Sequence, residues 1–187
     1  MQWLKKYKQE MMWFGAILLL SLALYFFVWK TDINKETVQN KNVQAFLKMI
    51  RWAEGTSNVY GYRTLFGGSL FNSFSDHPRK RFSFTQTDGK KNTTDAAGAY
   101  QFLSKTWDWV AGRLGLKDFS PENQDKAAIF LIKNRGALED VIAGRFDVAV
   151  QKVSKEWASM PNSTYPQPKR TIADAKRIYE QNGGQYA

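Results

Sequence analysis

The hydrophobic and polar positions divide the chain into one uninterrupted apolar run and a longer segment in which the two kinds alternate. No charged residue occurs in residues 11–29. A helix of that length extends about 28 Å, close to the roughly 30 Å hydrocarbon core of a bilayer. Lys5, Lys6 and Lys8 precede the run, so the positive-inside rule predicts a cytoplasmic N-terminus at residues 1–10 and an exported remainder.

We expect residues 11–29 to be an uncleaved transmembrane signal anchor. A cleavable signal peptide is the alternative, because Ser21-Leu22-Ala23 is a small-x-small site, but cleavage there would leave an exposed aromatic tail. Residues 30–42 are polar and are expected to form a linker. Residues 43–187 are then the folded, exported domain of a single-pass membrane protein.

In the exported segment, most of the apolar positions follow a helical period. Val43, Leu47 and Ile50 lie on one stripe of a helix predicted over residues 43–54, with Asn42 as its N-cap and Gly55 as its stop. Similar start and stop signals, with Ser104, Ser120 and Thr171 as N-caps, predict helices over residues 105–114, 121–136, 137–143, 146–158 and 172–181.

One segment alternates with the period of a strand. Phe82 and Phe84 alternate with polar neighbours over residues 81–87, and Asp88-Gly89 is a tight-turn signal. The polar run over residues 88–98 is expected to be mobile. These patterns predict an α+β domain that is mainly α, with one small β-hairpin region.

The composition excludes several kinds of active site. There is no Cys and only one His, His77, which excludes disulfides, thiolate zinc sites, multi-histidine metal sites and a Cys nucleophile. Because Pro78 follows His77 and favours an extended backbone there, we expect His77 to be structural. Residues 41–187 carry 22 basic and 14 acidic residues, a net charge of +8, and a basic domain favours a polyanionic partner.

Glu54 is the residue whose position indicates chemistry. It lies on the apolar stripe of the helix over residues 43–54 and at the negative end of the helix dipole, and both surroundings should raise the pKa of its carboxyl group. A carboxylic acid that stays protonated near neutral pH can act as a general acid. The alternative is an ordinary helix-end Glu that points into water beside Gly55.

A second carboxylate, which most glycosidases need, is absent from residues 55–75. The next acids are Asp76, Asp88 and Asp95. One acid combined with a nucleophile supplied by the substrate fits this spacing more simply than a pair of carboxylates does.

Many short blocks occur in an order that carries a family resemblance. They are Trp52-Ala53-Glu54-Gly55-Thr56, Gly61-Tyr62, Gly67-Gly68, Leu70-Phe71, Ser75-Asp76-His77-Pro78-Arg79-Lys80, Ala97-Gly98-Ala99-Tyr100-Gln101, the run from Leu114 to Pro121, Arg135-Gly136-Ala137-Leu138 and Trp157-Ala158-Ser159. From about residue 43 to residue 184 the chain resembles the phage lambda endolysin family of peptidoglycan lytic transglycosylases.

This resemblance implies a lysozyme-like fold with a cleft beside the β-hairpin, and it implies that Glu54 is the catalytic acid. It also implies that two lips border the cleft, at about residues 81–96 and 160–171. By the same resemblance Tyr100, Gln101, Tyr165 and Gln167 bind substrate. It further implies that the substrate is peptidoglycan glycan strands. The reaction is then expected to need no metal and no cofactor, and the protein is expected to be a monomer. Arg63 stands where the family has an acid just after Gly61-Tyr62, which argues against a second acid at this place. The first lip also differs in sequence from the family, so the contacts of that lip are not carried over.

The expected activity is cleavage of the MurNAc–GlcNAc β-1,4 bond with a 1,6-anhydro product, which degrades the bacterial wall and lyses the host. The alternative is hydrolysis of the same bond by a lysozyme. A noncatalytic wall-binding or nucleic-acid-binding module is the third candidate. No recognition helix or basic stripe is present in the sequence, so nucleic acid is not an expected partner.

Overall fold

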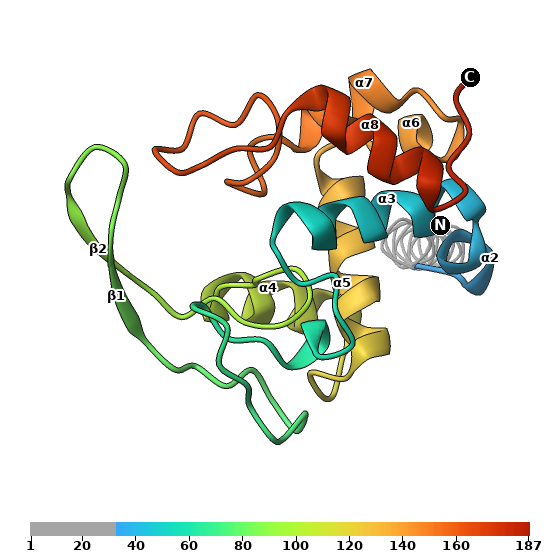
Figure 1. Cartoon of the computed structure of the whole chain (residues 1–187). Coiled ribbons are helices and arrows are strands. Elements are labelled where there is room, and N and C mark those ends of the chain that lie inside the picture. Colours follow the sequence, from blue (N-terminus) through green and yellow to red (C-terminus); the bar gives the residue numbers. More distant parts are fainter. Residues whose placement is uncertain (1–32) are drawn as a thin grey trace, which may run out of the picture. The chain divides into compact units, whose positions relative to one another are not determined.

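The structure, a computed structural model, describes residues 33–187. These residues form one compact unit that is mainly helical, as Figure 1 shows. Its helices are α2 (Lys35–Gln39), α3 (Lys41–Ala53), α4 (Ser104–Leu114), α5 (Pro121–Asn134), α6 (Leu138–Ile142), α7 (Phe146–Val153) and α8 (Ile172–Gln181), with a short 3-10 helix η1 (Gly61–Arg63). Strands β1 (Phe82–Thr85) and β2 (Lys91–Thr94) complete the elements. The predicted class, α+β and mainly α, is confirmed for this unit.

The predicted membrane segment at residues 11–29 lies outside the described residues, as does the predicted cytoplasmic stretch before it. Over residues 33–187, no helix has the length and apolar character needed to cross a membrane.

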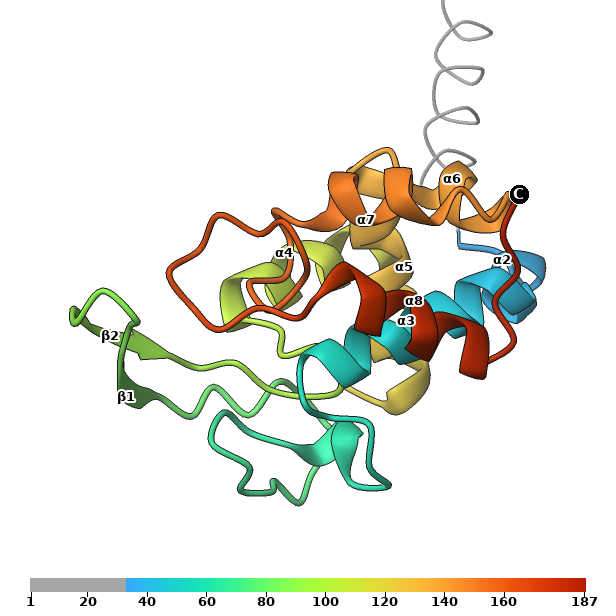
Figure 2. The ribbon, with the colours of Figure 1, turned by 45° about the horizontal axis from the view of Figure 1, so that its top comes forward.

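The helix α3 lies at the centre of the unit. It packs against α8, α6, α5 and α2, and Figure 2 shows α3 and α8 side by side. Its apolar stripe, including Val43, Phe46 and Ile50, is fully buried. The helix begins two residues earlier than predicted because Asn40, not Asn42, is its N-cap and accepts hydrogen bonds from the amides of residues 42 and 43. Asn42 instead donates to the Ile142 carbonyl oxygen at 3.0 Å.

The predicted linker over residues 30–42 is folded in its described part. Asn34 caps α2 by accepting a hydrogen bond from the Thr37 amide at 2.8 Å. Ile33 is only 8% exposed and joins the core, and α2 packs against α3 and α5. The sequence did not predict this helix because its residues are mostly polar. One buried apolar residue, Ile33, and one capping residue, Asn34, are enough to hold a helix of five residues against the core.

The other helices follow their predicted signals with small shifts at the ends. Thr171 caps α8 as predicted, accepting from the Asp174 amide at 3.1 Å. Ser104 is the first residue of α4 and not its cap, because its hydroxyl donates to Asp95 at 2.5 Å. The helices predicted over residues 121–136, 137–143 and 146–158 are real but end earlier, at Asn134, Ile142 and Val153.

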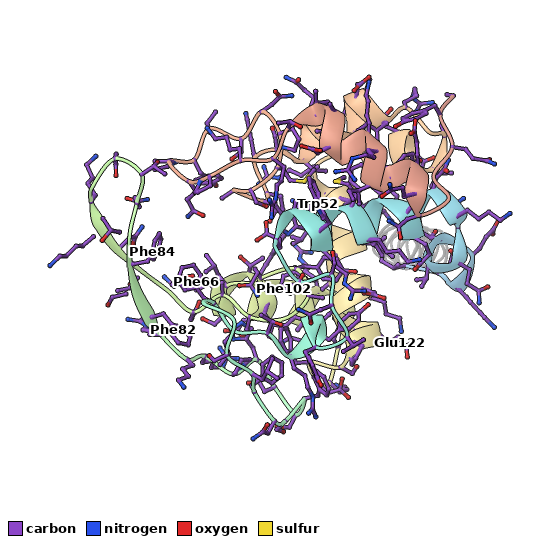
Figure 3. All side chains as sticks on the ribbon, in the orientation of Figure 1. Trp52, Phe66, Phe82, Phe84, Phe102 and Glu122 are labelled. Carbon is purple, nitrogen blue, oxygen red and sulfur yellow. The ribbon has the colours of Figure 1, made fainter. Side chains whose placement is uncertain are left out.

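The strands β1 and β2 pair antiparallel, with Phe82 opposite Thr94 and Thr85 opposite Lys91. The prediction that residues 88–98 are mobile is therefore wrong for β2, which has no apolar alternation of its own and is held by its pairing with β1. Phe66 packs against Phe84, with ring centroids 5.2 Å apart, and against Phe82 at 6.3 Å. Figure 3 shows these three rings gathered where the hairpin meets the rest of the unit.

The hairpin also meets a second projecting segment. The loop over residues 160–171, between α7 and α8, extends toward it in Figures 1 and 2. The Thr87 amide donates to the Pro166 carbonyl oxygen at 3.2 Å. The two predicted lips are thus in direct contact in this structure.

A buried amide holds three segments together beneath this region. Gln124 on α5 is 0% exposed. Its Oε1 accepts from the Ala99 amide at 2.8 Å, and its Nε2 donates to the carbonyl oxygens of Tyr62 at 3.0 Å and Phe119 at 2.8 Å. All the polar atoms of this side chain are therefore paired, as burial requires.

Substituting Gln124→Leu should destabilise the fold by at least about 3 kcal/mol, because it leaves one buried amide and two buried carbonyl oxygens without partners. Urea unfolding of both proteins measures the difference. Gln151→Leu is the control, since Gln151 is exposed on α7 and should change stability by less than about 0.5 kcal/mol. Equal losses in the two variants would show that the amide network contributes little.

Candidate active site

Glu54 is the C-cap of α3, with φ −76° and ψ −2°. Its amide donates to the Ile50 carbonyl oxygen at 2.9 Å, so the residue continues the apolar stripe by one more position. Gly55 follows with φ +74° and turns the chain away. The side chain is partly buried, which agrees with the predicted position on the apolar side of the helix and not with a fully solvated helix end.

Two residues from a distant part of the chain face this carboxyl group. The Ser159 hydroxyl donates a hydrogen bond to Glu54 Oε1, and the positive charge of Arg170 acts on the same group. The Arg170 Nε–H donates to the Ala53 carbonyl oxygen at 3.4 Å, and its guanidinium lies over the Trp52 ring at 4.9 Å. The Arg170 amide also donates to the Ser159 carbonyl oxygen at 2.9 Å. Both ends of the 160–171 loop therefore meet beside Glu54.

Burial raises the pKa of Glu54 from 4.5 to about 7, although the Ser159 hydrogen bond and the Arg170 charge both act to lower it. The predicted direction of this pKa shift is confirmed. A group with a pKa near 7 populates its acid and its base form comparably at neutral pH, and it can therefore serve both as a proton donor and as a proton acceptor.

Tyr100 is placed differently from its predicted role. It is 1% exposed, and its hydroxyl donates to Asp125 Oδ1 at 2.6 Å, while the Tyr62 hydroxyl donates to the same atom at 2.8 Å. The Trp157 indole N–H donates to the Tyr100 carbonyl oxygen at 3.1 Å. The predicted substrate contact of Tyr100 is therefore corrected: a buried ring with a paired hydroxyl supports the site from beneath and offers a sugar no surface.

Gln101, the neighbour of Tyr100, keeps part of its surface exposed. Its backbone has φ +48°, an uncommon conformation for a residue other than Gly. Its Nε2 donates to the carbonyl oxygens of Gly98 at 2.9 Å and Thr64 at 3.2 Å. These bonds hold the turn in its strained form and leave the side-chain carbonyl oxygen as the group available to a ligand.

Tyr165 and Gln167 both lie on the loop over residues 160–171. Tyr165 is 46% exposed, and its hydroxyl donates to the Lys155 carbonyl oxygen at 3.3 Å. Gln167 is partly exposed, and its amide donates to the Tyr165 carbonyl oxygen at 2.9 Å. The ends of this loop flank Glu54. The loop therefore connects three of the five predicted site residues: it carries Tyr165 and Gln167, and it begins and ends beside Glu54.

Known proteins share this arrangement of sequence and fold. Residues 44–186 match the family described as Endolysin. The chain belongs to the endolysin family.

The similarity to individual endolysins extends over most of both chains. The endolysin of Escherichia phage lambda is 39% identical over 151 residues, which is 78% of this chain and 93% of that protein. The endolysin of Escherichia phage P2 is 36% identical over 159 residues, 78% of this chain and 94% of that protein.

Solved structures show the same fold. Bacteriophage lambda lysozyme in complex with a chitohexasaccharide aligns with a TM-score of 0.74 and 37% identity, over 83% of this chain and 99% of that one. A second lysozyme structure from the same phage aligns with a TM-score of 0.68 and 35% identity, with the same coverage of both chains. The lysozyme-like fold is confirmed, and the endolysin described here is a lysozyme-type glycosidase.

Sequence reasoning missed two residues of the site, Ser159 and Arg170. Ser159 belongs to the Trp157-Ala158-Ser159 block that marks the family, so a signal was present without a role attached to it. Arg170 had no signal beyond its place at the end of a Pro-rich loop, because an isolated Arg in a loop is most often a solvated surface residue.

The other acids that could assist Glu54 are bonded elsewhere. Asp76 pairs with Arg79 at 3.0 Å, Asp88 with Lys90 at 3.2 Å, and Asp95 accepts from Ser104. In the described part of the endolysin, no group of three or more acidic or His side chains could hold a metal ion.

His77 is structural, as expected. It is buried, its Nδ1 accepts from the Arg79 amide at 3.1 Å, and its Nε2 lies 2.8 Å from the Phe102 carbonyl oxygen. With Nδ1 as an acceptor, the proton is on Nε2, which donates to Phe102.

The raised pKa of Glu54 has a consequence for stability. Between pH 4.5 and about pH 7 the folded protein keeps a proton on Glu54 that the unfolded chain has lost, so the free energy of unfolding falls as pH rises through this window. Glu54→Gln, which is always neutral, should therefore become more stable than the natural protein as pH rises, by up to about 3 kcal/mol, with no further change above about pH 7.

Urea unfolding across this pH range measures the difference. Glu139→Gln is the matched control, because Glu139 is exposed on α6, and its difference from the natural protein should stay flat with pH. A flat difference for Glu54→Gln as well would mean that the pKa of Glu54 is ordinary.

Proposed function

We propose that this endolysin is a peptidoglycan lytic transglycosylase that cleaves the β-1,4 bond between MurNAc and GlcNAc and forms a 1,6-anhydro product. The observation that carries the proposal is the Glu54 carboxyl group, which has a pKa of about 7, accepts a hydrogen bond from the Ser159 hydroxyl and is acted on by the charge of Arg170. The next acids downstream, Asp76, Asp88 and Asp95, are engaged with other partners. A mechanism that needs only one protein carboxyl group accounts for this arrangement.

In this reaction Glu54 first acts as the acid. Its proton passes to the glycosidic oxygen, and the bond between MurNAc C1 and that oxygen breaks. The C6 hydroxyl oxygen of the same MurNAc then bonds to C1, and its proton passes to the Glu54 carboxylate. The carboxyl group returns to its starting form, no water is consumed, and neither a metal nor a cofactor takes part.

The glycan strand would lie between the hairpin and the 160–171 loop, across the end of α3. The related lambda lysozyme was solved with a chitohexasaccharide, a β-1,4-linked sugar chain, which supports a glycan substrate here. Gln101, Tyr165 and Gln167 are the residues proposed to contact it. Tyr165 offers an exposed ring for stacking, and the two glutamines offer amide groups to sugar hydroxyls. Tyr100 acts only by holding the turn that carries Gln101.

Hydrolysis of the same bond is the competing reaction. It would need a carboxylate to hold a water, and Asp76 or Asp95 would have to leave its present partner to do so. A noncatalytic wall-binding module would have no need for a carboxyl group whose pKa is raised by burial.

Substituting Glu54→Gln should lower the rate of glycan release by at least about 10²–10⁴-fold, the usual contribution of one general acid–base group, because one residue performs both proton transfers. The natural protein should release fragments with a 1,6-anhydro end, one water lighter than hydrolysis products. Mass spectrometry of the soluble fragments from purified sacculi measures both results.

Glu139→Gln is again the control and should release fragments at the natural rate. A lytic Glu54→Gln variant would remove Glu54 from the mechanism. Reducing-end sugars from the natural protein would keep Glu54 but make the enzyme a hydrolase.

We also propose that the catalytic unit lies in the periplasm, attached to the inner membrane through residues 11–29. The support is sequence alone: the uncharged length of that run and the lysines that precede it. This topology places a wall-degrading enzyme on the side of the membrane where its substrate is.

Protease added to intact spheroplasts should therefore digest residues 33–187 and spare a tag placed before Met1, since the positive-inside rule keeps the lysine-rich end in the cytoplasm. Immunoblotting of both ends follows the digestion, and a cytoplasmic protein serves as the control for intact cells. A catalytic unit that resists protease until the membrane is lysed would contradict the topology.

A further inference from the structure

A pocket of about 330 Å³ opens between α3, α8 and the segment that follows Glu54. It is lined by Lys48, Arg51, Trp52, Ser57, Ile178 and Asn182. Lys48, Arg51 and Trp52 come from α3, and Ile178 and Asn182 from the end of α8 or next to it; Figures 1 and 2 show these two helices side by side. None of the residues proposed to hold the glycan lines this pocket.

The lining favours an anion with an apolar portion. Two of the six side chains are cationic and none is acidic. Lys48 is exposed and forms no ion pair with any residue of the described unit. The Trp52 ring and the Ile178 side chain supply the apolar part of the wall, and the Ser57 hydroxyl is a further hydrogen-bond donor.

Arg51 adds a donor that the protein leaves unused. Its Nη1 donates to the Tyr62 hydroxyl at 3.4 Å, and its guanidinium lies over the Tyr62 ring at 4.5 Å. Its Nε–H is buried and has no hydrogen-bond partner among residues 33–187. A buried unpaired donor costs free energy, and the residue that carries it is one of those that line the pocket.

The pocket adjoins the catalytic acid through shared residues. Trp52 lines the pocket, and its ring also packs against the guanidinium of Arg170, the cation beside Glu54. Ser57 follows Glu54 by three positions. Trp52 thus contacts both the pocket and the cation beside Glu54, and an extended peptide leaving a sugar bound at Glu54 gains about 3.3 Å of reach per residue.

We propose that this pocket binds a carboxylate of the peptide branch that MurNAc carries in peptidoglycan. This inference rests on the proposed function, which places MurNAc at Glu54. The peptide branch combines free carboxylates with small apolar side chains, which matches two cations beside an apolar wall. Through this contact the enzyme distinguishes glycan that carries peptides from bare glycan.

Two variants test the pocket without altering the buried network. Lys48→Gln removes the exposed cation, and Ser57→Asp adds a negative charge at a position whose side chain makes no hydrogen bond within the described unit. Lys117→Gln is the matched control, because Lys117 is exposed, makes no ion pair within residues 33–187 and lies outside the pocket. Two substrates are used: purified sacculi, and the free glycan strands that remain after an amidase has removed the peptides.

On peptide-bearing sacculi Lys48→Gln should raise the apparent KM about twofold to fivefold, the effect of losing one exposed ion pair. Ser57→Asp should raise it further, since it repels the carboxylate. On the peptide-free glycan strands both variants should match the natural protein and Lys117→Gln, which also shows that they are folded.

Equal effects on the two substrates, or no effect on either, would overturn the assignment of the pocket to the peptide. A failure of the proposed function appears differently, because the natural protein would then release no 1,6-anhydro fragments from either substrate. Competition by added inorganic phosphate on both substrates alike would instead indicate a general anion site and would also overturn the peptide assignment.

Discussion

The active site depends on placing one carboxyl group at the end of α3 in surroundings that disfavour its charge. Burial and the negative end of the helix dipole both act against ionisation of Glu54. Only the Ser159 hydroxyl and the Arg170 charge favour ionisation, and both belong to residues more than one hundred positions downstream. The packing of α3 against α6 and α8, which are distant in sequence, brings these residues to Glu54. The same helix packing therefore builds both the core and the active site.

A second constraint fixes the opposite wall of the site. The segment after Glu54, the turn that carries Gln101 and the loop before α5 have little regular structure, so their backbone groups need other partners. Gln124 satisfies three of them from the buried face of α5. The Thr56 hydroxyl donates to the Ala99 carbonyl oxygen at 2.5 Å. Polar groups in the core thus position the loops that apolar packing alone leaves undetermined.

The sequence predicted features that depend on local periodicity and missed those that depend on distant partners. The stripe on α3, the Thr171 cap and the raised pKa of Glu54 could be predicted, because each follows from spacing within one helix. The strand β2 could not, since its polar residues are extended only because β1 pairs with them. Tyr100 was assigned to the substrate because a motif names a residue but does not show which way its ring points.

The loop over residues 160–171 links recognition to proton transfer. Its residues Tyr165 and Gln167 are the proposed sugar contacts, while Ser159, just before the loop, and Arg170, near its end, lower the pKa of Glu54. The Ser159 hydrogen bond and the Arg170 charge, which lower that pKa, therefore depend on where this loop lies, and so does part of the burial that raises it. A raised pKa populates the protonated form, which is the form needed to protonate the glycosidic oxygen. Because the loop is anchored at the acid itself, a movement at its tip is transmitted to the carboxyl group through only a few residues of backbone.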